Sequence, residues 1–114
     1  MKVLICGSRS LNNINLDNYI NPYEIDTIID GGAYGVDKLA EKYAKKWNID
    51  NHIVTPMYGL YGRNAPLKRD EEMVDEADFI IAFWDGKSNG TKFTLDYAIE
   101  TKKPYWCHVF ENDD

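Results

Sequence analysis

Three glycine-containing turns, each following a hydrophobic strand-like segment, constrain the fold of this chain more than any other feature. They occupy residues 7–10, 31–37 and 86–91, and the last two lead into segments with helical periodicity. Glycine permits positive φ angles and close approach of a ligand to the backbone. A glycine turn before a helix N-terminus directs backbone N–H groups toward one point, which suits an anion such as a phosphate. The pattern therefore indicates a site of nucleotide size.

The strand-like segments alternate with helical segments along the chain. Strands are expected at 2–6, 25–30, 52–56, 78–84 and 105–110. Apolar residues at i, i+3, i+4 and i+7 predict helices from Val36 to Trp47, at 66–77 and at 91–102, whereas the Asn-rich segment 10–24 has room for at most a short helix. This alternation predicts an α/β fold, a Rossmann-like three-layer sandwich with a five-stranded parallel sheet. Ligands of such sheets bind beyond the carboxyl ends of the strands, where all three turns fall.

Composition sets limits on domain number, compartment and partners. The length of 114 residues and an apolar share of 44% fit a single domain over residues 1–114. A formal net charge of −6 argues against nucleic-acid binding, which normally needs a basic face. The apolar run at the amino terminus is too short for a signal peptide, and no run approaches the roughly 20 apolar residues of a membrane span. We therefore expect a cytoplasmic protein with no membrane partner.

The cysteines and histidines give no support for a metal site or a cofactor. Cys6 and Cys107 lie in strand-like runs and are expected to be reduced thiols. His52 and His108 lie apart, with no second ligand nearby in the sequence.

Several residues at the turns are candidates for ligand binding. Asp37 lies in the first turn of a helix, where it either favours the helix dipole or accepts a ribose hydroxyl. Thr91 is expected to cap the last helix, and Gly90 leaves room for a phosphate beside it. The expected ligand-binding residues are Gly7, Ser8, Arg9, Gly31, Gly32, Ala33, Gly35, Asp37, Arg63, Arg69, Trp84, Gly90, Thr91 and Thr94.

Arg9 and Arg69 are the expected cationic groups of this site. Arg9 directly follows a strand, and Arg69 lies near the start of a helix, where the dipole disfavours a cation. The alternative for Arg69 is a salt bridge to a local acid such as Asp70. The connection 56–65 is long enough for a lid or binding loop, and its Tyr58 and Tyr61 are candidates for stacking on a base.

Trp84 is a third candidate for stacking, although core packing suits its place at the end of an apolar strand better. For acid–base chemistry, the spacing pairs no two carboxylates. The candidates are Asp37, Asp70, Glu71, Glu72 and Asp85.

Four motifs in order resemble the YspA-like branch of the SLOG superfamily. They are residues 6–9 (Cys-Gly-Ser-Arg), 31–37 (Gly-Gly-Ala-Tyr-Gly-Val-Asp), 62–73 (from Gly-Arg-Asn-Ala to Arg-Asp-Glu-Glu-Met) and 82–91 (Ala-Phe-Trp-Asp-Gly-Lys-Ser-Asn-Gly-Thr). The resemblance covers nearly the whole chain. It implies a Rossmann-like domain of strand order 3-2-1-4-5, of bacterial or phage origin, that binds a nucleotide-derived small molecule. Relatives include the LOG phosphoribohydrolases, the DprA DNA-processing proteins and SLOG sensor domains that recognise NAD-derived signals.

The chain departs from this family at three positions. LOG enzymes carry Gly-Gly-x-Gly-Thr-x-x-Glu with a catalytic glutamate, and Thr94 stands where that glutamate would fall. Asp70 replaces an asparagine usual in the branch, and Tyr34 replaces a basic or small residue. We therefore expect a module that binds a nucleotide or an ADP-ribose-like ligand for sensing or sequestration. The alternatives are a hydrolase of such a ligand and a small partner subunit with a vestigial pocket, and a homo-oligomer such as a homodimer stays open.

Overall fold

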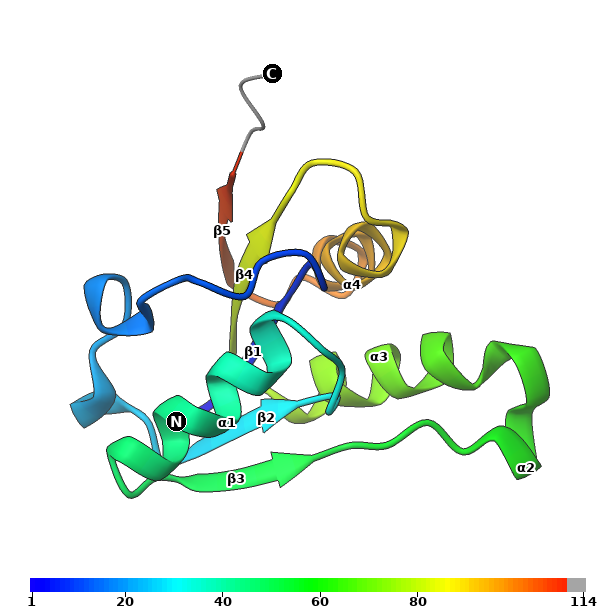
Figure 1. Cartoon of the computed structure of the whole chain (residues 1–114). Coiled ribbons are helices and arrows are strands. Elements are labelled where there is room, and N and C mark those ends of the chain that lie inside the picture. Colours follow the sequence, from blue (N-terminus) through cyan, green and yellow to red (C-terminus); the bar gives the residue numbers. More distant parts are fainter. Residues whose placement is uncertain (111–114) are drawn as a thin grey trace.

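The computed structural model describes residues 1–110, in which five parallel strands form one sheet of order β3-β2-β1-β4-β5 (Figure 1). Every neighbouring pair of strands is parallel, as the α/β expectation requires. The expected sheet and its strand order are confirmed. The strands are β1 (Lys2–Gly7), β2 (Thr27–Asp30), β3 (Asp50–Ile53), β4 (Phe79–Trp84) and β5 (Tyr105–Val109).

Helices cover both faces of the sheet. One face packs against α1 (Val36–Lys46) and the 3-10 turns η1 (Leu16–Asn18) and η2 (Pro22–Glu24), and the other packs against α3 (Ala65–Glu76) and α4 (Asn89–Glu100) (Figure 1). Val3 and Ile5 of β1 belong to the first core, and Leu4 and Cys6 belong to the second. Because both faces are covered, the central strands are continuous apolar runs, and three layers result.

Two elements, β3 and α4, begin two residues earlier than the sequence-based expectation. β3 spans Asp50–Ile53 instead of 52–56, because Asn48 turns the chain with a φ of 55° and pairing begins immediately afterwards. This edge strand is exposed, so it does not need the apolar residues on which the expectation relied. α4 begins at Asn89 instead of residue 91. The other strand ends differ by at most two residues.

The connection 56–65 is not an irregular loop. It forms α2 (Tyr58–Tyr61) and the 3-10 turn η3 (Gly62–Asn64), and α2 lies at the end of the molecule farthest from β5 (Figure 1). Backbone bonds from the N–H groups of Leu60 and Tyr61 to the Met57 carbonyl close this turn.

Both cysteines are free in the structure, as expected. Among residues 1–110, no helix is long and apolar enough to cross a membrane.

Candidate functional site

A cleft with a volume of about 440 Å³ opens at the carboxyl ends of β1 and β4. The winding direction of the sheet reverses between these two strands, which is where parallel α/β sheets bind ligands. Of the expected residues, the cleft is lined by Gly7, Ser8, Arg9, Ala33, Asp37, Arg69, Gly90, Thr91 and Thr94. Gly31, Gly32, Gly35, Arg63 and Trp84 are not part of its lining.

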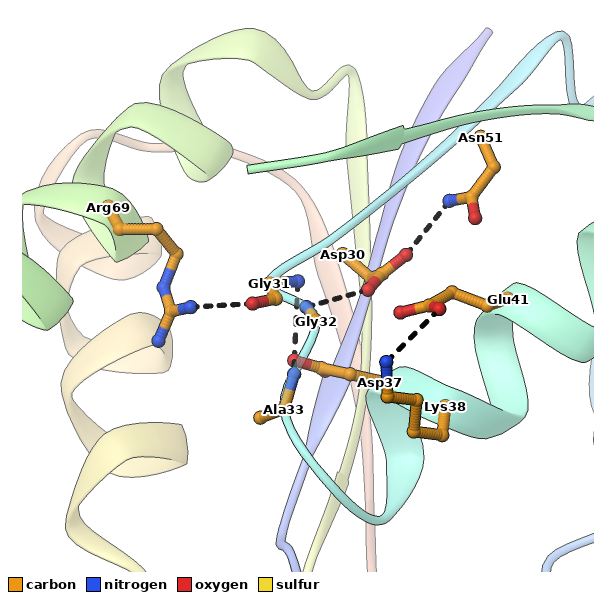
Figure 2. A network of polar contacts seen from close by, with 9 residues as sticks. All are labelled: Asp30, Gly31, Gly32, Ala33, Asp37, Lys38, Glu41, Asn51 and Arg69. Atoms are coloured by element: carbon orange, nitrogen blue, oxygen red, sulfur yellow. Dashed lines mark hydrogen bonds and ion pairs between the residues drawn. The ribbon is translucent and has the colours of Figure 1, made fainter. Parts of the chain in front are cut away.

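The turn after β2 does not offer the free N–H groups that the sequence suggested. Oδ2 of Asp37 accepts hydrogen bonds from the N–H groups of Gly31 (3.2 Å) and Ala33 (3.1 Å), and Oδ1 of Asp30 accepts from Gly32 (2.8 Å) (Figure 2). Buried backbone donors need partners, and the chain supplies them from its own acids. The N–H groups of Gly31, Gly32 and Ala33 are therefore not free to hold a phosphate.

Asp37 instead fixes the turn against α1 and faces the cleft. It is a buried carboxyl group, and burial raises its pKa, while the N–H of Ala33 and the charge of Arg69 lower it. Both of its bonds from the turn end at Oδ2. Among residues 1–110, Oδ1 receives no hydrogen bond, so this oxygen is available as an acceptor.

Arg69 connects α3 to the same turn. Its Nε donates to Oδ1 of Asp70 (2.9 Å), and its Nη1 donates to the carbonyl of Gly31 (2.8 Å) (Figure 2). A Cβ on Gly31 would lie 2.6 Å from Nη1, so a larger residue there would displace the guanidinium. The alternative expected from the sequence, a salt bridge to Asp70, is therefore present. Arg69 lines the cleft, and its Nε and Nη1 groups are each bonded within the protein.

Asp70 gives the cleft a second buried carboxyl group. Burial raises its pKa to about 6, although the neighbouring Arg69 charge and hydrogen bonds from Arg69 and Thr94 lower it. The sequence placed Asp70 among the candidate carboxylates without a partner. In the structure it lies beside Arg69 and Thr94, and all three line the cleft.

The loop between β4 and α4 is held in place by Asp85. Its Oδ1 accepts from the N–H groups of Lys87 and Ser88 (both 2.8 Å), and these bonds lower the pKa of Asp85. Its own N–H donates to Oγ of Ser8 (3.0 Å), and its Oδ2 accepts from Ser10 (3.3 Å). The turns after β1 and β4 therefore form one connected wall of the cleft.

The N-terminus of α4 is a part of the cleft with several free backbone donors. Its N-cap is Ser88, not Thr91, because the helix begins at Asn89. Among residues 1–110, no group accepts from the N–H groups of Asn89, Gly90 and Thr91, and Lys92 makes the first helical bond, to the Ser88 carbonyl. Hydroxyl groups surround this end: Oγ of Ser88 lies 3.0 Å from Oγ of Ser8 and 3.1 Å from Oγ1 of Thr91.

Arg9 supplies positive charge at the mouth of the cleft. Its side chain is exposed and forms no ion pair within the described part of the chain. In contrast to Arg69, it is therefore available to a ligand.

The expected residues outside the cleft have structural surroundings that explain their types. Gly35 has a φ of 78°, and a Cβ there would lie 2.6 Å from the carbonyl oxygens of Ser8 and Arg9.

Trp84 packs against the second core, and its Nε1 donates to the Ser88 carbonyl (3.0 Å), so core packing is the correct alternative for it. Tyr58, Tyr61 and Arg63 are exposed on or beside α2 and do not line the cleft.

The structure adds lining residues that the sequence-based ligand set does not include. These are Cys6, Ser10, Pro66, Leu67, Asp70, Met73, Asp85 and Ser88. Pro66, Asp70 and Met73 recur at helical spacing on the face of α3 that carries Arg69. This spacing could have predicted them as lining residues from the sequence. Predicting that Ser88 lines the cleft would have required the correct start of α4.

Comparisons with known proteins leave the family unassigned. The chain is 29% identical to the Gene 61 protein of Mycobacterium phage D29 over 116 residues, an alignment that covers 90% of this chain and 92% of the phage protein. This similarity fits the expected bacterial or phage origin. No family model matches the chain. No solved structure matches it significantly.

Proposed function

We propose that this chain binds a phosphate-bearing, nucleotide-derived small molecule in the cleft between β1 and β4, for sensing or sequestration. The observation that carries the proposal is the free N-terminus of α4, which faces the same cleft as the unpaired Arg9. A helix N-terminus combines free N–H donors with a positive dipole end, and both favour a phosphate. The proposal agrees with the resemblance to the YspA-like branch of the SLOG superfamily.

The side of the cleft formed by Asp37 and Asp70 suits the neutral part of such a ligand. Asp37 and Asp70 present acceptor oxygens, which pair with hydroxyl or amino groups and repel phosphate. A ribose carries both a phosphate and free hydroxyl groups, so one ligand satisfies the two walls together. The volume of about 440 Å³ falls within the usual range of small-molecule sites, about 300–1,000 Å³.

A hydrolase is the second candidate function, and Asp70 favours it. A carboxyl group with a pKa of about 6 in a cleft can exchange a proton near neutral pH. Against this candidate, Thr94 stands where the LOG relatives carry their catalytic glutamate, and a hydroxyl is a poor base at that pH.

The substitution Gly90→Asp tests the proposed phosphate site without disturbing the protein. A Cβ at Gly90 meets no atom within 4 Å, and an acid in the first turn of a helix is favourable for stability. We expect the melting temperature to stay level or rise, while affinity falls at least about tenfold through charge repulsion and lost space. The probe is the tightest binder in a thermal-shift screen of AMP, ADP-ribose, NAD and cyclic dinucleotides.

Gly59→Asp is the matched control, since a Cβ there also meets no atom and Gly59 lies in α2, outside the cleft. Calorimetry should give the parental affinity for this variant. Equal affinities of the parent and Gly90→Asp would place the ligand elsewhere, and a screen without any binder would refute the proposal.

A further inference from the structure

The two edges of the sheet differ in how they are protected. At one edge, β3 is four residues long and carries Asp50, Asn51 and His52, and His52 is paired with Glu76. Charged side chains and short strands are the usual means of preventing edge-to-edge association. At the other edge, β5 has the sequence Tyr-Trp-Cys-His-Val, with no Lys, Arg, Asp or Glu. Within residues 1–110, β5 pairs only with β4.

We propose that β5 is a homodimer interface, at which β5 of a second copy pairs antiparallel with it and joins the two sheets. The proposal is independent of the ligand, because none of the β5 residues lines the cleft. In Figure 1, β5 forms the outer border of the sheet, remote from α2.

The hydrogen bonds to β4 show which groups of β5 point outward. The N–H of Phe110 donates to the Trp84 carbonyl (2.7 Å), and the Pro104 carbonyl accepts from Ile80 (3.1 Å). Residues alternate in a parallel ladder, so Trp106 and His108 also direct their backbone groups toward β4. The N–H and C=O groups of Tyr105, Cys107 and Val109 therefore point away from the sheet.

These outward residues are arranged symmetrically about Cys107. A twofold axis beside Cys107 places it opposite Cys107 of the second copy and places Tyr105 opposite Val109 of that copy. Residues with facing backbone groups in an antiparallel pair exchange both N–H···O bonds. Every outward group of the strand is satisfied in this register, as a closed isologous contact requires.

The side chains also suit this self-association. Tyr105, Trp106 and Val109 are 44%, 39% and 43% exposed, which is high for large apolar residues of a strand. Tyr19, 39% exposed, lies against Trp106 with ring centroids 6.0 Å apart and extends this apolar surface. The same register places Trp106 opposite His108 of the second copy, a pair that already stacks within one chain. This antiparallel register about Cys107 places no two like-charged side chains of β5 opposite one another.

The charges of the flanking sequence favour the antiparallel direction. Lys102 and Lys103 precede β5, whereas Glu111, Asp113 and Asp114 follow it in the sequence. An antiparallel alignment of the two sequences sets the acidic residues of one copy opposite the basic residues of the other, whereas a parallel alignment sets like charges opposite one another. Opposite charges across an interface select orientation and partner.

Oligomeric state and amide exchange of the full chain test this interface together. Sedimentation equilibrium should give a dimer for the parent and a monomer for Val109→Lys, which adds a charge to the edge. NMR should show exchange of the Tyr105 and Cys107 amides at least about tenfold slower in the parent than in the variant. The Trp106 and His108 amides, bonded to β4 in either state, serve as internal references.

Leu60→Lys is the matched control, since Leu60 is 67% exposed on α2, where Tyr58 and Tyr61 are also exposed and form a second apolar surface. It should remain dimeric. A monomeric parent at NMR concentrations overturns the proposal. So does a dimer that Leu60→Lys dissociates and Val109→Lys does not, or one in which the Tyr105 and Cys107 amides exchange rapidly. If Val109→Lys does not fold, exchange in the parent is still decisive. Slow exchange of the Tyr105 and Cys107 amides supports the interface, and rapid exchange overturns it.

Discussion

Two arginines line the cleft, and their surroundings give them different roles. Arg9 is exposed and unpaired within the described residues, so its loss removes a ligand contact and little else. Arg69 is partly buried, with its side chain 12% exposed, and lies between Asp70 and the Gly31 carbonyl, so its loss leaves a buried acid and a buried carbonyl without their donor. Breaking one side of a buried pair is costly because the other charge stays buried.

We therefore expect Arg9→Ala to weaken binding of the best nucleotide ligand by about tenfold with an unchanged melting temperature. Arg69→Ala should lower the free energy of unfolding by about 2–4 kcal/mol, with or without ligand. Calorimetry and urea denaturation measure the two effects separately. Asp70→Asn combined with Arg69→Ala should recover part of the lost stability, because it removes the unpaired charge. An Arg69→Ala variant as stable as the parent would contradict this account.

Where β2 meets α1, three polar side chains lie behind the glycine turn. The carboxyl groups of Asp30 and Glu41 face one another, and Nδ2 of Asn51 donates to Oδ2 of Asp30 (2.8 Å) (Figure 2). Burial, followed by the hydrogen-bonded Glu41 carboxyl, raises the pKa of Asp30 to about 7. Oε2 of Glu41 is buried and has no partner among the described groups. Strand and helix therefore meet through two facing carboxyl groups, and the Glu41 carboxyl helps to raise the pKa of Asp30.

Glu41→Gln should lower the pKa of Asp30, because the amide donates to the Asp30 carboxylate and the second acid is gone, while burial still raises that pKa. The parent's raised Asp30 pKa contributes stability that is complete below the unfolded value, near 4, and is lost as the pH rises through about 7. The variant should therefore match the parent at pH 5 and exceed it at pH 8 by about 1 kcal/mol in free energy of unfolding. Urea denaturation at both pH values measures the difference.

Glu72→Gln is the control for this experiment, because Glu72 is an exposed acid that forms no ion pair within residues 1–110. Its stability relative to the parent should not change with pH. A Glu41→Gln variant that is less stable than the parent at pH 8 would show that the Glu41 carboxyl does not raise the pKa of Asp30.

The arrangement of the chain in space was predictable where it follows from local pattern. The apolar run of β4 and the helical spacing from Val36 onward are properties of neighbouring residues, so the parallel sheet and the layers followed, whereas the strand order came from the family resemblance. The bonding of the turn from Gly31 to Asp37 was not predictable. Which donors remain free depends on where the Asp37 and Asp30 carboxylates point, and sequence spacing does not contain that information.

The start of α4 shows the same limit. Thr91 and Ser88 are both good N-caps, and tertiary contacts of Ser88 with Ser8 and Trp84 accompany the earlier start. This shift by two residues leaves the N–H groups of Asn89 and Gly90 facing the cleft. It therefore determines where a phosphate is expected to bind.

Whether the bound ligand is also turned over depends on the carboxyl groups of the cleft together. Asp37 is held by the turn through Oδ2, Asp85 is occupied by the β4–α4 loop, and Asp70 is paired with Arg69. Cleavage of an N-glycosidic bond needs a carboxylate placed against the scissile bond with a suitable pKa. Asp70 comes nearest to that condition, because burial raises its pKa to about 6, but its partner Arg69 holds it in place.

We therefore expect binding without release of free base. Nucleoside monophosphates, ADP-ribose and NAD, incubated with the purified chain and followed by chromatography, should remain intact, while the best binder raises the melting temperature. Ligand at 100 times its dissociation constant stabilises the folded state by about 2.7 kcal/mol, which is a shift of several degrees in a domain of this size. Steady multiple turnover that Asp70→Asn abolishes without loss of binding would establish the hydrolase instead, because that variant removes the acid and keeps the shape of the side chain.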